Sequence, residues 1–324
     1  MRSTVLVTGA SGMAGRFVVP ALQRLGFKVR GQYHREPGKA PGVDWRQMNF
    51  LERLDFDELV TGCDAVVHLA AELANVSRMN RVNVDATRAL LAAAQSRGVR
   101  YFGHASSIVV YGSPRRRTVD EATPLLDPDA PIARQYNAEP YMLEYARTKT
   151  LGELAIRASR PSFNVDLYRP TVVADFDRLL EAGSWSFIRK FAAAYRRTQY
   201  IYAPDAAAAI AHLVSRGLSA ERPSEKVEAF NICDQEAGTY RDLLGAAYEA
   251  TGDPRYKMRV DIPFILDLAK DLVKYRNIVM RYPLGMLMFS NAQLLATGFK
   301  FPTGFKSALS DAVGRSSPTP FAAQ

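Results

Sequence analysis

Continuous apolar runs alternate with amphipathic segments through the first half of the chain. The run TVLVTGA at 4–10 is rich in β-branched residues and predicts a strand buried on both faces. The segment AGRFVVPALQRLG at 14–26 repeats apolar residues at helical spacing and ends in a glycine, which predicts a helix. The same patterns predict further strands at 28–34, 64–71, 100–107, 163–170 and 227–234 and another helix at 84–98.

This alternation predicts an α/β fold, because buried strands joined by helices form a parallel sheet that helices cover on both faces. We expect a doubly wound sheet of the Rossmann type. The last third of the chain, in contrast, has mostly helical or irregular patterns. We therefore predict a sheet domain over 1–170 and 200–235, a smaller, mostly helical substrate-binding domain over 171–199 and 236–315, and a mobile tail at 316–324.

Composition narrows the partners of the chain. Its 324 residues are 48% apolar and 23% charged, which is an ordinary balance for a globular protein. The formal net charge of +9 favours a phosphorylated cofactor or substrate, nucleic acid, or simply a basic solvated surface. The basic run at 115–117 has no interleaved aromatic residue, and no nucleic-acid-binding module has its signature here, so we expect no nucleic-acid partner.

Cysteine usage and hydropathy bear on compartment. Cys63 and Cys233 have neither disulfide nor metal spacing, and no signal peptide precedes the first strand, which predicts a reducing cytoplasm. Neither histidines nor carboxylates have metal-ligand spacing, so no metal is expected. No apolar run is long enough to span a membrane. Residues 261–290 come nearest, and we interpret them as helices over a cleft rather than a membrane-surface segment.

The stretch VLVTGASGMAG places Gly9, Gly12 and Gly15 between the first predicted strand and the first predicted helix. Glycines at these points permit a tight turn and bring the backbone close to a pyrophosphate. The helix start then supplies free N–H groups and a partial positive charge. A strand–turn–helix context makes this pattern far more specific than the glycines alone.

Several motifs, in order, resemble the extended branch of the short-chain dehydrogenase/reductase superfamily. That branch includes nucleotide-sugar epimerases, dehydratases and reductases, and enzymes like 3β-hydroxysteroid dehydrogenase and dihydroflavonol reductase. The motifs that carry the resemblance are TGASGMAG (8–15), CDAVVHLAA (63–71), VNVDATRALLAAA (82–94), ASSIVVYG (105–112), LYRP (167–170), YIYAPDAAAAIAHLV (200–214), FNICDQEAGTYRDLL (230–244) and LLATGFKFP (294–302).

The resemblance implies a set of site residues. It implies catalysis by Ser107, Tyr145 and Lys149, and a structural or proton-relay role for Asn83. The lysine would also hold the ribose hydroxyls beside the nicotinamide. The residues expected to bind an NAD(P) cofactor are Gly9, Ser11, Gly12, Met13, Gly15, Arg30, His34, Arg35, Asn49, Phe50, Leu69, Ala70, Ala71, Asn83, Ser106, Tyr145, Lys149, Pro170 and Thr171.

The end of the second strand distinguishes NAD from NADP, because an acid there binds the ribose 2′-OH whereas a basic residue accommodates a 2′-phosphate. The stretch VRGQYHREP has no acid before Glu36 and offers Arg30, His34 and Arg35. An arginine can hold a phosphate through paired, charge-assisted hydrogen bonds. We therefore predict NADP(H), with NAD(H) as the alternative. Asn49 stands where the family usually has an aspartate that contacts adenine.

Tyr145 and Lys149 are four residues apart in EPYMLEYARTK, so a helix would place them on one face. A phenol is a poor base at neutral pH, and a nearby cation favours its phenolate. Ser107 lies in the strand-end motif and would position a substrate oxygen. His68 and His104, on or beside predicted strands, are interpreted as core histidines. Residues 126–141 are interpreted as an inserted loop at the cleft mouth.

The same motifs favour some reactions over others. The family's dehydratases commonly carry an Asp-Glu pair where this chain has SIVV, and its nucleotide-sugar epimerases carry an asparagine where this chain has Val172. We therefore predict a ketone/alcohol oxidoreductase that uses NADP(H) and a small-molecule substrate. A nucleotide-sugar epimerase or 4-ketoreductase is the alternative, and a non-catalytic NAD(P)-sensing regulator is the third hypothesis. The resemblance also implies a homodimer through the helices near 84–98 and 141–158.

Overall fold

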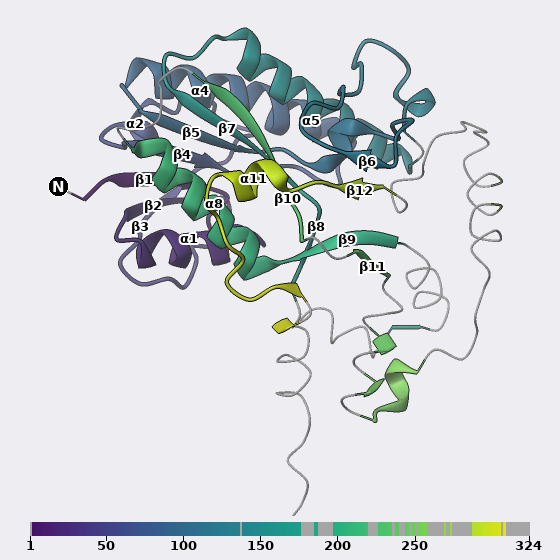
Figure 1. The fold of residues 1–324 in the computed structure, drawn as a ribbon. Helices are drawn as coiled ribbons and strands as arrows, with labels where there is room; N and C mark the ends of the chain where they lie inside the picture. The colour runs from purple at the N-terminus through teal and green to yellow at the C-terminus, as the bar shows by residue number, and fades with distance from the viewer. Residues whose placement is uncertain are drawn as a thin grey trace, which may run out of the picture.

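The central sheet is parallel throughout and reverses its strand order in the middle. The computed structural model of the chain describes residues 2–136, 138–175, 185–186, 197–219, 226–234, 237–239, 244–245, 248–249, 252–257, 269, 273, 287–305 and 307–308. Within them, the strand order is β10-β7-β5-β4-β1-β2-β3 (Figure 1). The strands are β1 (Thr4–Thr8), β2 (Lys28–Tyr33), β3 (Asp44–Gln47), β4 (Ala65–His68), β5 (Tyr101–Ala105), β7 (Asn164–Pro170) and β10 (Val227–Ile232).

From β1 the chain moves to one edge of the sheet through β2 and β3. It then returns to β4 beside β1 and continues to the other edge. The order therefore reverses between β1 and β4, and the carboxyl ends of these two strands flank the crevice where open α/β sheets bind their ligands. The doubly wound parallel fold predicted from the sequence is confirmed.

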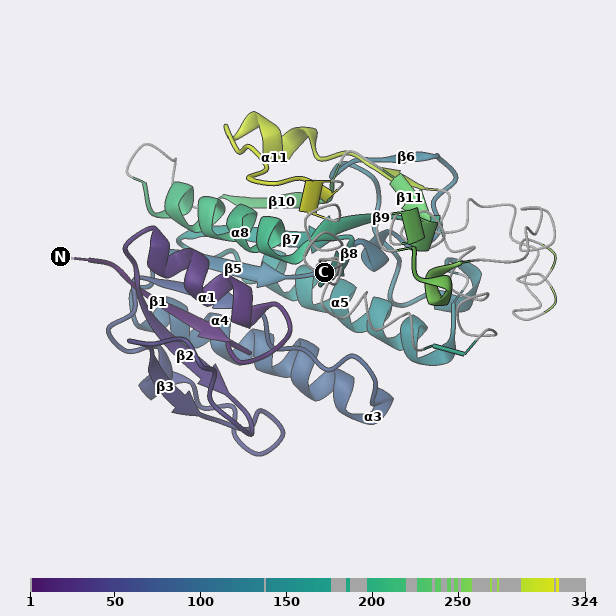
Figure 2. The same cartoon turned by 90° about the horizontal axis from the view of Figure 1, so that it is seen from below.

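Helices cover both faces of this sheet. One face carries α1 (Gly15–Arg24), α8 (Ala203–Leu218) and the short α11 (Ala292–Ala296), and the other carries α2 (Asp57–Val60), α4 (Ala86–Ser96) and α5 (Pro140–Ala158) (Figure 2). The sequence of strand β1 is continuously apolar because helices cover both of its faces. Val5 and Val7 pack towards α1 and α8, whereas Leu6 packs towards α2 and α4.

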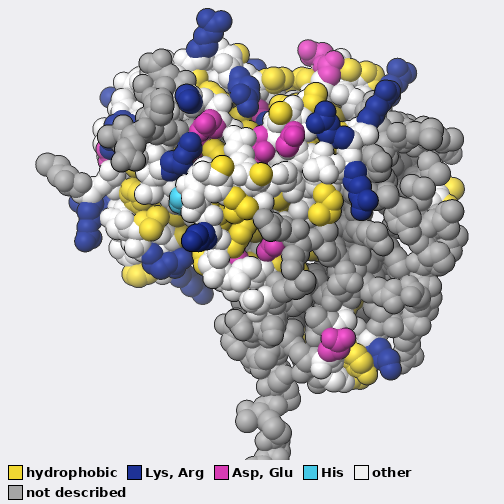
Figure 3. Space-filling model, in the orientation of Figure 1, with side chains coloured by type: hydrophobic (Ala, Val, Ile, Leu, Met, Phe, Trp, Pro, Cys, Tyr) yellow, Lys and Arg dark blue, Asp and Glu magenta, His cyan; other side chains and the backbone are white. Residues whose placement is uncertain are grey.

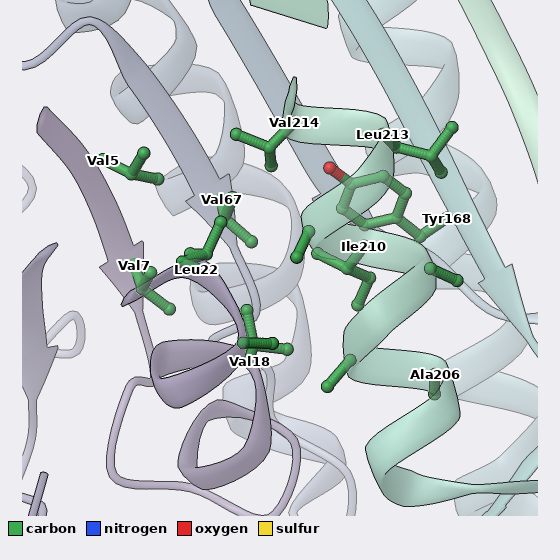
Figure 4. Close-up of a cluster of buried hydrophobic side chains, with 14 of the residues drawn as sticks. Val5, Val7, Val18, Leu22, Val67, Tyr168, Ala206, Ile210, Leu213 and Val214 are labelled. Carbon is green, nitrogen blue, oxygen red and sulfur yellow. The ribbon is translucent and has the colours of Figure 1, made fainter. Parts of the chain in front are cut away.

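The core under α1 and α8 is made mostly of small and branched aliphatic side chains, with a few aromatic rings among them. Figure 4 shows Val18 and Leu22 of α1 facing Ile210 and Val214 of α8, over the strands that carry Val67 and Tyr168. Each of these side chains is almost fully buried. Their packing fixes α1 on the sheet and therefore fixes the turn that precedes α1.

Several shorter elements lie beyond the carboxyl edge of the sheet. Two small sheets are present among the described residues: β8 (Val172–Ala174), β9 (Arg197–Tyr202) and β11 (Ala237–Thr239) form one, and β6 (Thr118–Val119) pairs with β12 (Met288–Phe289) in the other. The remaining short elements are α3 (Val76–Met79), the π-helix η1 (Asn80–Asp85), and the 3₁₀ turns η2 (Ile108–Tyr111), η3 (Ile132–Arg134) and η5 (Pro254–Tyr256).

The sequence patterns did not predict these small strands or edge strand β3, because strands of two to six residues leave little periodicity. The helix predicted at 84–98 begins earlier, as the π-helix η1, and continues as α4. Most of the predicted second domain, of the segment 261–290 and of the tail 316–324 lies outside the described residues, so the division into two domains stays a prediction.

On the face drawn in Figure 3, lysine and arginine side chains of the described residues are scattered, with acidic side chains among them. These residues form no continuous basic patch on that face. Among the described helices, none has both the length and the apolar composition needed to cross a membrane.

Candidate active site

The turn between β1 and α1 has two positions, Gly9 and Gly15, where no side chain fits. Gly9 has a φ of +64°, and a Cβ there would lie 2.9 Å from the backbone nitrogen of Ala70, at the end of the neighbouring strand β4. A Cβ on Gly15 would overlap the carbonyl oxygen of Gly9. The turn is closed by a 2.9 Å hydrogen bond from the Gly12 N–H to the Gly9 carbonyl. Its shape therefore fits the close approach of a pyrophosphate to backbone N–H groups.

A buried glutamine on β2 holds this turn in place, and the sequence analysis missed it. The Gln32 side chain accepts a 2.9 Å hydrogen bond from the Gly9 N–H and donates a 2.7 Å bond to the Met48 carbonyl. It thereby connects the glycine turn to the segment after β3. The tertiary pairing of β1, β2 and β3 creates this contact. No distinct signal in the sequence pointed to it, because β2 also contains Lys28 and Arg30.

The basic residues predicted for cofactor selectivity lie in different surroundings. Arg30 is already engaged, since its guanidinium contacts the Asp44 carboxylate at 2.9 Å and donates to the carbonyls of Leu59 and Thr61 at 2.9 and 2.8 Å. In contrast, His34 and Arg35 are exposed directly after β2. The structure therefore places His34 and Arg35, but not Arg30, with their side chains open to a ligand.

The residues predicted to contact adenine follow β3. Asn49 caps its own turn, because its side chain accepts from the Leu51 N–H at 3.1 Å and donates to the Glu52 carboxylate at 2.7 Å. Phe50 is buried and packs edge-on against Phe56, with ring centroids 5.0 Å apart. Phe50 therefore shapes the core under this turn.

A buried histidine connects the end of β4 to η1. The Thr87 hydroxyl donates to the Asn83 carbonyl at 2.9 Å, so it must accept from His68 Nε2 at 3.0 Å. His68 Nδ1 is then the acceptor from the Thr8 hydroxyl at 2.7 Å, and that hydroxyl accepts from the Ala70 N–H at 3.2 Å. This directed chain of hydrogen bonds fixes the backbone at Leu69–Ala71, where the cofactor is predicted to bind.

The imidazoles of His68 and His104 are both fully buried, as expected of core histidines, with ring centroids 5.4 Å apart. Burial and the nearby charge of Lys149 lower the pKa of His68 to about 3, so this ring is neutral at physiological pH. The same causes lower the pKa of His104 well below its ordinary value. Within the described part of the chain, neither ring nitrogen of His104 has a hydrogen-bond partner.

The three predicted catalytic residues meet at the carboxyl end of β5. Ser107 follows this strand, and its hydroxyl is near enough to the Tyr145 phenol to act on the pKa of that phenol. Lys149 lies one turn after Tyr145 on α5, with its Nζ 5.8 Å from the centroid of the tyrosine ring. The lysine is almost fully buried and donates a 2.7 Å hydrogen bond to the Ala105 carbonyl.

Burial shifts the pKa values of this pair in opposite directions. It raises the pKa of Tyr145 to about 12, although the hydrogen bond with Ser107 acts in the other direction. It lowers the pKa of Lys149 to about 8, although the negative charge of Glu153 opposes that change. Near neutral pH the pair is therefore a neutral phenol beside an ammonium group.

Asn83 lies in a π-helical turn, a distortion common at functional sites. Its side chain accepts from the Glu72 N–H at 2.9 Å and donates to the Glu72 carbonyl at 3.0 Å. It also donates to the Thr148 hydroxyl on α5 at 3.1 Å. These bonds hold the loop after β4 against the catalytic helix.

The other predicted site residues surround this centre. Ser106 is buried and hydrogen-bonds Glu153 at 2.5 Å, so it faces the core. The Thr171 N–H, after Pro170 at the end of β7, donates to the Ile232 carbonyl at 3.1 Å. Ser11 is half-buried in the glycine turn, and Met13 is 43% exposed there. Within the described residues, no cluster of three or more histidine, cysteine or acidic side chains could hold a metal ion.

A glycine turn where the strand order reverses, together with a tyrosine–lysine pair on one face of α5, is typical of a nucleotide-binding α/β protein of the oxidoreductase type. The chain belongs to the NAD dependent epimerase/dehydratase family, whose model matches residues 5–233. The resemblance to the extended short-chain dehydrogenase/reductase superfamily is thus confirmed, and the members of this class are NAD(P)-dependent enzymes.

Several curated relatives are reductases by name, and two of them match about half of this chain at 29–31% identity. A 4-hydroxy-2-methyl-3-oxo-4-farnesyl-3,4-dihydroquinoline-1-oxide ketoreductase from Stigmatella aurantiaca is 31% identical over 176 residues, which are 52% of this chain and 49% of the relative. A ceramide reductase from Caulobacter vibrioides is 29% identical over 171 residues, 50% of this chain and 44% of the relative. The chain thus spans about half the length of these relatives.

Among solved structures, a short-chain dehydrogenase/reductase superfamily protein from Agrobacterium tumefaciens with bound NAD superposes with a TM-score of 0.72. It is 24% identical, and the match covers 96% of each chain. This likeness shows that the two proteins share their fold.

Replacing Gly9 with alanine is expected to weaken nicotinamide cofactor binding at least about tenfold, because the new methyl group would displace the backbone at Ala70. Fluorescence titration with NADPH and NADH measures this change. Gly26→Ala is the matched control, since Gly26 also has a positive φ but no atom lies within 4 Å of its added Cβ. Equal cofactor affinities for the two variants would contradict the role assigned to the glycine turn.

Proposed function

We propose that this protein reduces a ketone to a secondary alcohol with NADPH, and catalyses the reverse oxidation with NADP⁺. The convergence of Ser107, Tyr145 and Lys149 at the end of β5 is the observation that carries this proposal. A bound nicotinamide cofactor supplies or accepts the hydride. The glycine turn, with Gly9 and Gly15 in positions where no side chain fits, suits the pyrophosphate of that cofactor.

The side chains supply the proton that balances the hydride. In the reductive direction, the protonated Tyr145 hydroxyl donates its proton to the carbonyl oxygen as negative charge develops there. The phenolate left behind is stabilised by the Lys149 ammonium and regains a proton from solvent. The Ser107 hydroxyl donates a hydrogen bond that orients the substrate oxygen. The Asn83 side chain keeps the loop after β4 against α5, and so supports the wall of the site.

An apolar ketone is the substrate class that we propose. Large apolar side chains are exposed in segments that follow the carboxyl ends of β1, β4 and β7 and at the start of α5. They are Met13, Leu73, Val76, Tyr141 and Val172. Exposed apolar side chains gathered at one edge are typical of an interaction site for an apolar ligand. The farnesyl-quinoline ketoreductase and the ceramide reductase, by their names, act on molecules with long apolar chains.

A nucleotide-sugar epimerase or 4-ketoreductase is the second candidate, since the matched family is named for epimerases and dehydratases. The same three catalytic side chains would serve it. A nucleotide-sugar epimerase of this family is expected to have an asparagine at position 172. Val172, which is 46% exposed, has no side-chain group that could hydrogen-bond the sugar nucleotide there. A cofactor-sensing regulator is the third candidate, and the intact Ser107, Tyr145 and Lys149 argue against it.

We propose NADP(H) as the cofactor because Arg35 is an exposed cation and His34 an exposed imidazole directly after β2, where an acid would select NAD. Arg30 is not proposed to bind the 2′-phosphate, because its guanidinium already contacts Asp44 and two backbone carbonyls. NAD(H) remains the alternative, and a neighbour of the same fold has NAD bound.

The homodimer through α4 and α5 stays a proposal. Between these two helices runs a groove lined by Arg88, Leu91, Ala92, Gln95, Ser96, Ala155 and Ser159. Leu154, on the outer face of α5, is 40% exposed. Sedimentation that gives only the monomer mass at micromolar concentration would contradict this dimer.

The cytoplasmic location likewise stays a proposal, and the buried free thiols of Cys63 and Cys233 suit a reducing compartment.

Replacing Tyr145 with phenylalanine is expected to lower kcat at least about a hundredfold, because the variant cannot transfer the proton. The dissociation constant for NADPH should change little. Tyr141→Phe is the matched control, since it removes a hydroxyl one turn earlier on α5 and keeps the aromatic ring that the proposed apolar surface uses. Retention of turnover in Tyr145→Phe, measured by NADPH oxidation, would overturn the mechanism.

The substrate class is tested with a series of methyl ketones of increasing chain length, beside a UDP-4-keto-sugar. We expect kcat/KM to rise about two- to fourfold for each added methylene that becomes buried, until the apolar surface is filled. NADPH consumption measures the rate. Turnover of the keto-sugar together with no chain-length dependence would favour the second candidate.

Arg35→Ala is expected to raise the dissociation constant for NADPH about tenfold and to leave that for NADH unchanged, because only NADPH has the 2′-phosphate. The matched control is Lys28→Ala, which removes an exposed cation from the opposite end of β2. Isothermal titration with both cofactors measures the effect. Tighter binding of NADH than of NADPH by the unaltered protein would overturn the cofactor assignment.

A further inference from the structure

A buried ion pair lies directly behind the catalytic residues. The Arg169 guanidinium on β7 meets the Glu153 carboxylate on α5 through two parallel contacts, Nε to Oε1 at 2.9 Å and Nη2 to Oε2 at 2.5 Å. Their side chains are 1% and 0% exposed. Such a paired geometry is the strongest that an arginine and a carboxylate can adopt.

The remaining polar atoms of this pair are also bonded. Glu153 Oε1 accepts a further 2.5 Å hydrogen bond from the Ser106 hydroxyl. Arg169 Nη1 donates to the Tyr111 hydroxyl at 2.7 Å, and that hydroxyl donates to Asn231 Oδ1 at 2.8 Å. A buried charged pair without such partners would carry a large desolvation cost. The network therefore joins α5 to β5, η2, β7 and β10.

The last residue of β5 and the two residues that follow it contact one face of α5. The Ala105 carbonyl accepts from Lys149, the Ser106 hydroxyl donates to Glu153, and the Ser107 hydroxyl lies near the Tyr145 phenol. The three helix residues are spaced by four, so they lie one turn apart on one face. Two of these contacts involve the predicted catalytic residues. The third belongs to the ion pair, which is thereby built into the same interface.

We propose that Glu153 and Arg169 are positioning residues for the catalytic centre. Glu153 holds the 105–107 segment against α5 and supplies the negative charge that balances the buried Lys149 ammonium. Arg169 orients Glu153 through their two parallel hydrogen bonds. This proposal rests on the proposed function, since it assigns Lys149 the role of a charged group.

The surroundings of Lys149 make Glu153 the group to test. The other titratable groups that face this lysine are Tyr145 on its own helix, His68 on β4 and His104 on β5, and burial holds the two histidines neutral. Arg169 and, beyond it, Tyr111 on η2 reach the lysine through Glu153. Among these neighbours, the carboxylate of Glu153 is the one negative charge, and it opposes the effect of burial on the pKa of Lys149.

The first experiment measures NADPH affinity and turnover against pH for the parent protein and Glu153→Gln. Affinity should fall as Lys149 loses its proton, with a midpoint near pH 8 in the parent. In Glu153→Gln the midpoint should lie about one pH unit lower, because an opposite charge close to the lysine is gone. Glu228→Gln is the matched control, because it breaks the Arg216–Glu228 pair between α8 and β10. Its midpoint should equal that of the parent.

The second experiment separates positioning from simple structural support and covers the case in which Glu153→Gln does not fold. The double variant Glu153→Leu with Arg169→Met removes both charges and keeps the volume apolar, a change that buried ion pairs often tolerate. If the pair positions Lys149, the double variant folds and its midpoint still lies below that of the parent. A midpoint equal to the parent's in this variant would overturn the proposal.

The two proposals fail in distinguishable ways. NADPH affinity is measured without any catalytic turnover. The pH midpoint of that affinity therefore tests the role of Glu153 whether or not a substrate is known. Turnover that survives in Tyr145→Phe contradicts the proposed function. An unshifted midpoint, in a protein that depends on Tyr145, contradicts the positioning role of Glu153 and Arg169 alone.

Discussion

The contact between the end of β5 and one face of α5 is the interaction on which the site depends. The last strand residue and the two residues after it, 105–107, each contact one of three helix residues one turn apart. A shift of α5 by one turn would break all three contacts together. The buried pair of Glu153 and Arg169 ties the same helix to β7, and so opposes that shift.

Burial at this contact shifts the pKa values of the two catalytic side chains on α5. Lys149 is a charged group in an apolar environment, which lowers its pKa to about 8, and Tyr145 is a phenol in the same environment, which raises its pKa to about 12. A phenol that keeps its proton beside an ammonium group is suited to donate that proton when negative charge develops nearby. The helix–strand contact thus sets both the geometry and the protonation states.

The cofactor side of the crevice is organised by the same kind of constraint. Gln32 ties the glycine turn to the segment after β3, and His68 ties the turn after β4 to α4 through the hydroxyls of Thr8 and Thr87. Both side chains are buried and bonded at both ends. The backbone that is proposed to meet the cofactor is therefore held from the inside of the sheet.

Local patterns in the sequence determined the alternating strands and helices, the glycine turn and the spacing of Tyr145 and Lys149, because each depends on residues a few positions apart. Only the tertiary structure decided that Arg30 is engaged with Asp44, that Gln32 holds Gly9, and that Glu153 meets Arg169 behind the catalytic pair. Those contacts join residues 14 to 23 positions apart on different strands and helices. Strand order and register bring such residues together, and no local pattern encodes either of them.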